Sequence, residues 1–304
     1  MEGWTYGGTA SNPVPTSSTN GTSNVTYKYK VSTAADSTYT TTKPSNAGTY
    51  TVQATFAATD NYNATTATAN FTIAKAGNPI AVTTPQTWSE AFATSAKTKA
   101  ITAATNGQGN VTYAIQSQKD KDGTTVDYFT LSGTTLTRKA NTPVNKSVYA
   151  VVIRATAEGN SNYNSGYKDI TVNVTVTKAT GSGSVTMEGW TYGGTASNPV
   201  PTSSTNGTSN VTYKYKVSTA ADSTYTTTKP SAAGTYTVQA TFAATDNYNE
   251  VVATGNFTIA KASIAVPSSP AAKTYNGSSQ SHGISVPSNT SIVTASSTTS
   301  ATDA

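Results

Sequence analysis

The sequence predicts an all-β protein made of tandem β-sandwich modules. The first observation is alternation, which is clearest where Tyr50, Val52, Ala54 and Phe56 occupy every second position. A period of two is typical of a strand with one face on a core and the other in water. The second is composition: Thr, Ser and Tyr are abundant, while charged residues are only 11%. β-Branched and aromatic side chains fit a half-buried pleated surface. The third is internal repetition.

The repetition divides the chain into domains. Its 304 residues are too many for one sandwich core and suit two to four domains. Residues 1–76 recur as 187–262 at a constant shift of 186, so the two copies are nearly identical. Five positions differ, namely Asn46/Ala232, Ala64/Glu250, Thr65/Val251, Thr66/Val252 and Ala69/Gly255.

Strands that end in Lys-Ala mark the module boundaries. These endings are Lys75-Ala76, Lys178-Ala179 and Lys261-Ala262. We expect a first module over 1–76 that lacks its opening strand, a diverged middle module over 77–179, a third module over 180–262 and an incomplete, poorly ordered fourth over 263–304. Linkers of a few residues leave little room for swinging, so the prediction is an elongated array that belongs to a longer chain.

Six or seven strands are expected in each module, with no helix. In the first module, Pro13 and Pro15 confine the second segment to an edge or a loop. The predicted segments are 4–6, 25–31, 37–42, 47–56 and a closing strand through Phe71 and Ile73. The middle module carries an insertion, in which Asp122-Gly123 predicts a tight turn and 129–136 a second hairpin.

One motif suggests the kind of sandwich. Gly48-Thr49-Tyr50-Thr51-Val52 resembles the immunoglobulin stretch in which Tyr stands two residues before Cys. In that corner the Tyr hydroxyl bonds to upstream backbone, and here Val52 takes the Cys position. We therefore assign a structural role to Tyr50 and Tyr236, and to the tryptophans that open the modules, Trp4, Trp88 and Trp190.

Four motifs together resemble bacterial immunoglobulin-like repeats of the MBG (YGX-type) kind. They are Trp-Thr-Tyr-Gly, Ala-Gly-Thr-Tyr-Thr-Val, Asp-Asn-Tyr-Asn and Phe-Thr-Ile-Ala-Lys-Ala. The first and third modules carry the full pattern and the fourth part of it. The middle module is similar more loosely, and its 129–136 stretch is similar to cadherin-like bacterial repeats. The resemblance implies immunoglobulin-like modules, or a smaller β-grasp-like variant, with a non-catalytic spacer or adhesive role.

Catalytic chemistry has little support in the sequence. His282 is the only histidine and Cys is absent, which excludes a Cys nucleophile and leaves no histidine for a triad elsewhere. Zinc sites usually draw on several His or Cys. The acids Glu2, Asp36 and Asp60 are scattered, so no carboxylate pair for glycoside hydrolysis is evident. We expect no enzyme and no cofactor.

Two other sites were weighed against simpler interpretations. Asp120, Asp122 and Asp127 form the densest acidic group and are a weak calcium candidate. The EF-hand spacing is absent, and a solvated hairpin turn at Asp122-Gly123 is the simpler explanation. A Lys–Asn isopeptide crosslink would need a buried lysine. Lys28 and Lys30 alternate away from the tyrosines and are expected to face water.

Charge and hydropathy limit the partners. The net charge of +5 is spread without a basic run, so nucleic acid is not predicted. No window approaches the roughly 20 apolar residues of a membrane span. A multidomain chain without cysteine is typical of bacterial surfaces.

The expectation is a stalk or spacer segment of a large bacterial cell-surface or secreted protein, in contact with adjacent modules. The alternative is an adhesive module, centred on the middle domain, that binds a glycan or a host protein. Tyr29 and Tyr39 are candidates for stacking on sugar rings.

Overall fold

The computed structural model describes residues 1–265, 272–274, 276–278 and 280. Most of the expected fourth module, with His282, lies outside the described residues. By its contacts the chain divides into two units. Unit 1 is Met1–Ala179 with Asp246–Tyr248, and unit 2 is Thr180–Thr245 with the chain from Asn249 onward. The first and middle modules thus belong to one unit.

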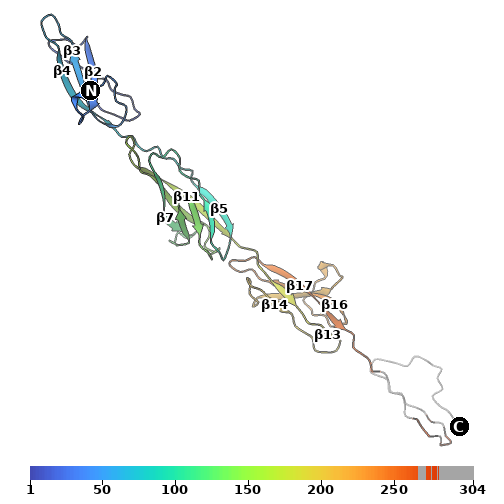
Figure 1. Ribbon diagram of the computed structural model, residues 1–304. Helices are drawn as coiled ribbons and strands as arrows, with labels where there is room; N and C mark the ends of the chain where they lie inside the picture. The colour runs from blue at the N-terminus through green and yellow to red at the C-terminus, as the bar shows by residue number, and fades with distance from the viewer. Residues whose placement is uncertain (266–271, 275, 279, 281–304) are drawn as a thin grey trace. The chain divides into compact units, whose positions relative to one another are not determined.

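The middle module is a sandwich of two sheets (Figure 1). One sheet contains, in order, β5 (Gln86–Ala91), β11 (Gly166–Thr177), β10 (Tyr149–Ala157) and β7 (Val111–Lys119). The other contains β6 (Lys97–Ala100), β9 (Thr135–Arg138) and β8 (Phe129–Ser132). Taken in chain order, these are the C, F and G strands facing the B, E and D strands of an immunoglobulin sandwich. The first strand, β5, joins the C-F-G sheet by pairing in parallel with β11.

Alternation along the central strands builds the core of this module. Tyr149, Val151, Ile153, Ala155 and Ala157 occupy every second position of β10, and all are 0% exposed. The facing side chains of β11 and the hairpin β8–β9 close the same cluster. Burying each large aliphatic side chain contributes about 1.5–3 kcal/mol, so this strand is the main source of stability in the module.

The first module has one four-stranded sheet. Its order is β1 (Trp4–Thr5), β4 (Thr65–Ala74), β3 (Gly48–Phe56) and β2 (Val25–Val31). Our expectation of six or seven strands was wrong for this module. The predicted strand over 37–42 is a 3-10 turn, η1 (Asp36–Thr38), followed by a single bridge between Thr40 and Tyr29.

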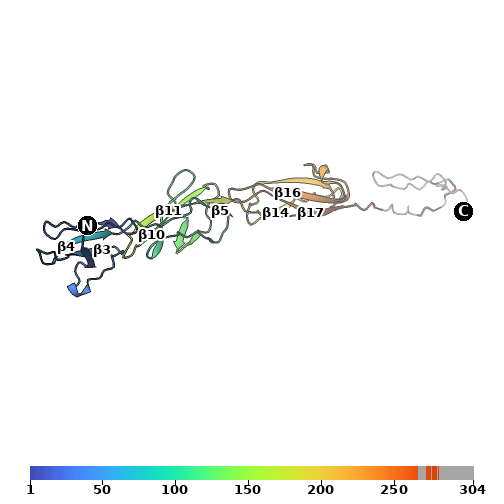
Figure 2. The same ribbon diagram turned by 90° about the horizontal axis from the view of Figure 1, so that it is seen from above.

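The third module repeats this sheet and adds a second one. Its main sheet is β13 (Trp190–Thr191), β17 (Val251–Ala260), β16 (Gly234–Phe242) and β15 (Val211–Val217), with η2 (Asp222–Thr224) after β15. The second sheet pairs β12 (Ser184–Thr186) with β14 (Val200–Thr202). Strand β12 contacts β16 and β17 of the main sheet, both of which are labelled in Figure 2. The equivalent of β14 in the first module, 14–16, has the same sequence and is not a strand.

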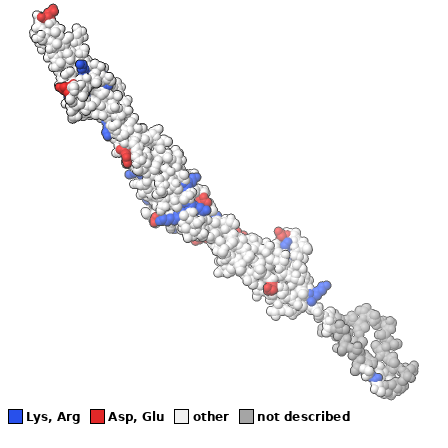
Figure 3. Space-filling view, viewed as in Figure 1, with Lys and Arg blue, Asp and Glu red and all other residues white. Residues whose placement is uncertain are grey.

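The fold is therefore all-β, with tandem immunoglobulin-like modules. The middle module has seven strands, and the third has the same sheet order without the D and E strands. This arrangement supports the immunoglobulin-like prediction over the β-grasp-like alternative. No helix among the described residues is long and apolar enough to cross a membrane. On the face shown in Figure 3, charged side chains are few, and both signs are interspersed.

Candidate interaction surfaces

The three tyrosines at the start of the F-type strands all bond back to the preceding loop. The Tyr50 hydroxyl donates to the Asn46 carbonyl at 3.0 Å, and the Tyr236 hydroxyl to the Ala232 carbonyl at 3.0 Å. In the diverged copy the Tyr149 hydroxyl donates to the Pro143 carbonyl at 2.6 Å. Burial raises the pKa of Tyr149, which keeps it a donor at any physiological pH.

The module-opening tryptophans lie in the cores. Trp4 stacks on Phe71 with ring centroids 5.4 Å apart, and Trp190 stacks on Phe257 at 5.5 Å. Trp88 is 4% exposed in the core of the middle module. Trp4 and Trp190 are half-buried and pack against the core of their modules, so all three tryptophans contribute to stability.

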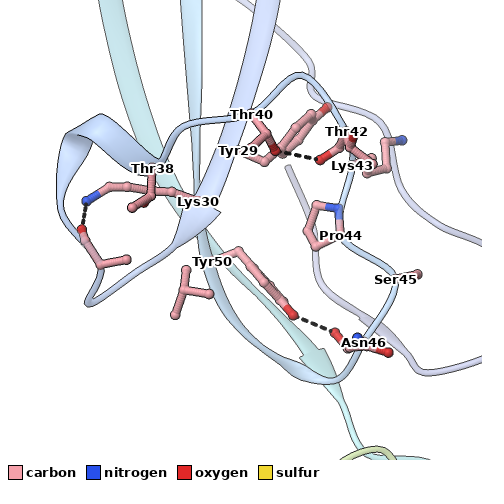
Figure 4. A pocket seen from close by; sticks show the side chains of 12 residues that line it. Tyr29, Lys30, Thr38, Thr40, Thr42, Lys43, Pro44, Ser45, Asn46 and Tyr50 are labelled. Atoms are coloured by element: carbon pink, nitrogen blue, oxygen red, sulfur yellow. Dashed lines mark hydrogen bonds between the residues drawn. The ribbon is translucent and has the colours of Figure 1, made fainter.

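A pocket opens on the first module between the ends of β2 and β3 and the loop that joins them (Figure 4). Its volume is about 520 Å³, and Tyr29 and Tyr50 form part of its wall. The third module has a pocket of about the same size, 520 Å³, lined by the equivalent residues. Tyr29 is only 6% exposed and belongs to the core, so it offers no free face for a sugar.

The lysines that line this pocket are committed to protein partners. Lys30, expected to face water, has a side chain only 11% exposed that pairs with Asp36 at 3.0 Å. The loop 32–36 folds over it, which alternation along the strand could not reveal. Lys43 donates to the carbonyl of Ser11 at 2.9 Å and to Asn12 Oδ1 at 2.7 Å. Hydroxyl groups and apolar surface thus share the lining with two lysines whose ammonium groups are already hydrogen-bonded. Such a mixed lining suits a neutral ligand with hydroxyl groups better than a cation.

The three aspartates of the middle module do not form a common set of ligands. Buried Asp120 accepts the backbone N–H groups of Asp122 and Thr124 at 3.0 and 2.9 Å. Asp122 pairs with Lys121 and Lys146, whose hydrogen bonds lower its pKa. Asp127 pairs with Lys139 at 2.7 Å. Within the described part of the chain, no group of three His, Cys, Asp or Glu could hold a metal ion.

Within unit 1, the turn of the middle module at 160–164 docks on the end of the first module. The Ala76 N–H donates to the Asn162 carbonyl at 2.9 Å, and the Asn164 N–H donates to the Ala76 carbonyl at 2.9 Å. The Tyr163 ring meets the Tyr6 ring edge to face, with centroids 5.3 Å apart.

The side chain of Asn162 completes this joint. Its Oδ1 accepts the Ala47 N–H at 2.9 Å, and its Nδ2 donates to Asn46 Oδ1 at 3.1 Å. Lys75 reaches across to the Asn160 carbonyl at 2.8 Å. Together, the main-chain hydrogen bonds, the contact between the two tyrosine rings and the Asn162 amide restrict how the first and middle modules can move within unit 1.

The segment Asp246–Tyr248, also part of unit 1, makes two corresponding contacts with the middle module. The Ala179 N–H donates to the Asn247 carbonyl at 2.9 Å, as Ala76 does to Asn162. The Tyr248 ring meets Phe92 edge to face at 5.4 Å. The motif Asp-Asn-Tyr-Asn does not by itself predict these contacts. The recurrence of this motif along the chain was the available signal that the turn does more than connect two strands.

Comparisons with known proteins give distant likenesses only. No protein-family model matches the chain, and no curated protein does. The four N-terminal Ig domains of Dscam1 isoform 4.44 are 15% identical at a TM-score of 0.29, over 69% of this chain and 54% of that one. Mouse protocadherin-24 EC1-3 is 13% identical at a TM-score of 0.32, over 85% and 96%.

The immunoglobulin domains 1–5 of Sidekick-1 are 13% identical at a TM-score of 0.23, over 86% of this chain and 58% of that one. The chain thus spans about half the length of the Dscam1 fragment. Likenesses at these scores carry no argument about function. The assignment of the fold rests on strand order and on the tyrosine corners.

Proposed function

We propose that this chain is a non-catalytic spacer segment of a large extracellular protein, on a bacterial surface or secreted. The observation that carries the proposal is the joint at Asn162 and Tyr163. A linker alone would leave neighbouring modules free to reorient, whereas a joint with main-chain bonds restricts them. The absence of cysteine and the resemblance to bacterial surface repeats support the proposed extracellular, bacterial location.

The corresponding backbone bond at Asn247 and ring contact at Tyr248 support a recurring function for the turn. A protein that has to keep a binding domain at a fixed distance benefits from joints of this kind. The stiffness then comes from the protein's own repeated sequence, with no metal or disulfide needed.

The test measures the stiffness of the joint inside unit 1. Because the chain has no cysteine, two can be introduced for spin labels, at exposed Thr26 in β2 and exposed Lys168 in β11. We expect a narrow distance distribution by pulsed electron paramagnetic resonance. Changing both Asn162 and Tyr163 to Ala should broaden it.

The matched control changes Asn61 and Tyr62 to Ala. These residues form the equivalent turn of the first module, where the Tyr62 ring is 51% exposed. The control should leave the distance distribution unchanged. A broad distribution in the unaltered chain, or equal broadening by both double variants, would refute the spacer proposal.

A second candidate function is adhesion, and the twin pockets favour it. Each has about 520 Å³ and a lining in which threonine and tyrosine hydroxyl groups stand beside two hydrogen-bonded lysines. The test is a glycan array probed with the full chain and with a variant in which Pro44 and Pro230 are both Arg, which fills both pockets. Binding that the variant loses supports adhesion through the pockets, and a blank array removes this candidate.

A further inference from the structure

In the first module, the corner tyrosine and the docked asparagine bond to the two ends of one peptide group. The Tyr50 hydroxyl donates to the Asn46 carbonyl at 3.0 Å (Figure 4). The N–H of the next residue, Ala47, donates to Asn162 Oδ1 at 2.9 Å. That carbonyl and that N–H belong to the same peptide bond. The tyrosine and the docked turn are therefore connected through a single planar group.

The middle module has the same arrangement at its own corner. The Tyr149 hydroxyl donates to the Pro143 carbonyl at 2.6 Å, and the Val144 N–H donates to Asn247 Oδ1 at 3.4 Å. The two residues that form this peptide differ from those of the first module. The arrangement thus recurs without identity of sequence, so it is not a trace of the duplication that relates the first and third modules.

The planarity of the peptide group links the two hydrogen bonds. In a trans peptide the carbonyl and the N–H point in opposite directions, so a bond that fixes the direction of one also fixes the other. A hydroxyl that donates to the carbonyl polarises the group as well, which makes its N–H a better donor. The corner tyrosine therefore both aims and strengthens the bond to the docked asparagine.

The loop before β3 has few other restraints. Among the described residues, the segment 41–47 makes no hydrogen bond from backbone to backbone. The Lys43 side chain anchors the beginning of this segment, and the Tyr50 hydroxyl holds its end at Asn46. Without that hydroxyl, the end of the loop can turn even while the Tyr50 ring stays stacked on Phe71.

The corresponding loop of the middle module has a restraint of its own. The Ser147 N–H donates to the Val144 carbonyl at 3.0 Å. The bond from this loop to Asn247 is also longer than the bond to Asn162. The contact at Asn162 should therefore depend on its corner tyrosine more strongly than the contact at Asn247 does.

We propose that this peptide group, which we call the corner peptide, is the recognition element of the joint, and that its partner is the asparagine amide of an Asn-Tyr turn. Tyr50 and Tyr149 are positioning residues, because they aim the N–H of the corner peptide at that amide. The proposal rests on the spacer function proposed above and names the group that restricts the joint. It gives the tyrosine corner a role between modules in addition to its role within one.

The test replaces Tyr50 by Phe in the full chain, which removes the hydroxyl and keeps the ring. The readout is the rate of amide hydrogen exchange at Ala47, measured residue by residue by NMR. We expect Ala47 to exchange roughly three- to tenfold faster, as the loss of one hydrogen bond predicts, with smaller changes along β3. Tyr149→Phe should accelerate exchange at Val144 by a smaller factor.

The matched control is Val52→Ala, in the same strand. The Val52 side chain is 5% exposed and packs in the core of the first module, so this variant lowers stability without touching the corner peptide. Exchange at Ala47 should stay unchanged in it, because that N–H opens by local motion. A purely structural role for Tyr50 predicts the same response from both variants.

A double-mutant cycle shows whether the tyrosine acts through the docked asparagine. In a chain that carries Asn162→Ala, the Ala47 N–H has already lost its acceptor. Adding Tyr50→Phe should then accelerate exchange at Ala47 no further. The spin-label distances between positions 26 and 168 should follow the same pattern, with broadening by Tyr50→Phe alone and no added broadening in the double variant.

Three results would overturn the proposal: unchanged exchange at Ala47 in Tyr50→Phe, an equal change in Val52→Ala, or additive effects in the cycle. The spacer proposal fails by a different result, a broad distance distribution in the unaltered chain. A narrow distribution that Asn162→Ala with Tyr163→Ala broadens and Tyr50→Phe does not would reject the positioning role and leave the spacer proposal standing.

Discussion

Replacing Arg138 of the middle module tests whether a buried, partly unpaired guanidinium destabilises the core. It ends β9 with a side chain that is 0% exposed. Its Nη2 donates to the Ala91 carbonyl at 2.8 Å, but Nε and Nη1 have no acceptor among the described residues. Burial lowers the pKa of this guanidinium, and the charge of Glu90 acts in the opposite direction. We predict that Arg138→Met stabilises the module.

The expected gain in the free energy of unfolding follows from the three guanidinium nitrogen atoms of Arg138. Losing the charged hydrogen bond from Nη2 costs about 1.5–3 kcal/mol, while relieving two unpaired buried groups contributes about 1–3 kcal/mol each. Methionine also fills most of the volume with apolar atoms. The net expectation is a gain of roughly 1–3 kcal/mol, in line with other replacements of buried ions by apolar side chains.

The assay uses the tryptophans, because each module has one. In a background with Trp4 and Trp190 changed to Phe, buried Trp88 reports on the middle module alone. Urea unfolding followed by its fluorescence should show a midpoint raised by roughly 1 M, for a slope of about 2 kcal/mol per M. The control is Lys139→Met, the next residue, whose ion pair with Asp127 is exposed and contributes under about 1 kcal/mol. A midpoint that falls for Arg138→Met would refute the reasoning.

Three further predictions concern other contacts. Tyr149→Phe should destabilise the middle module by about 1–3 kcal/mol in the same urea assay, because its carbonyl acceptor stays buried without a partner. Gly255→Ala should lower the thermal stability of unit 2 by about 1–3 kcal/mol, since the new Cβ meets the Val185 carbonyl at 2.5 Å; an unchanged melting temperature would contradict this. The guanidinium of Arg154, paired with Asp169, lowers the pKa of the Asp169 carboxyl group. The ion pair therefore stabilises the fold fully at pH values above the usual carboxyl pKa. This stabilisation is lost as the pH falls through the lowered pKa of the folded state. Asp169→Asn should therefore cost under about 1 kcal/mol at pH 7, with melting temperatures that converge in acid.

Local patterns in the sequence were sufficient for the long central strands and for the repeat. Alternation at Tyr50, Val52 and Phe56 placed β3, because only the backbone geometry of a strand puts every second side chain on one face. The near-identity of 1–76 and 187–262 gave the repeat directly. The Tyr corner was also readable, since its acceptor lies only four residues upstream, at Asn46.

Tertiary structure decided whatever depends on residues distant in the chain. Val-Pro-Thr is a strand at 200–202 and not at 14–16, although the sequence is the same, because only the former has a partner in β12. Phe92 and Tyr6 both contact the tyrosine of an Asn-Tyr-Asn turn edge to face. Phe92 lies four residues after Trp88, however, whereas Tyr6 lies two residues after Trp4. Whether a strand has a pairing partner, and which residue a tyrosine contacts, depend on the three-dimensional fold, and no local periodicity encodes them.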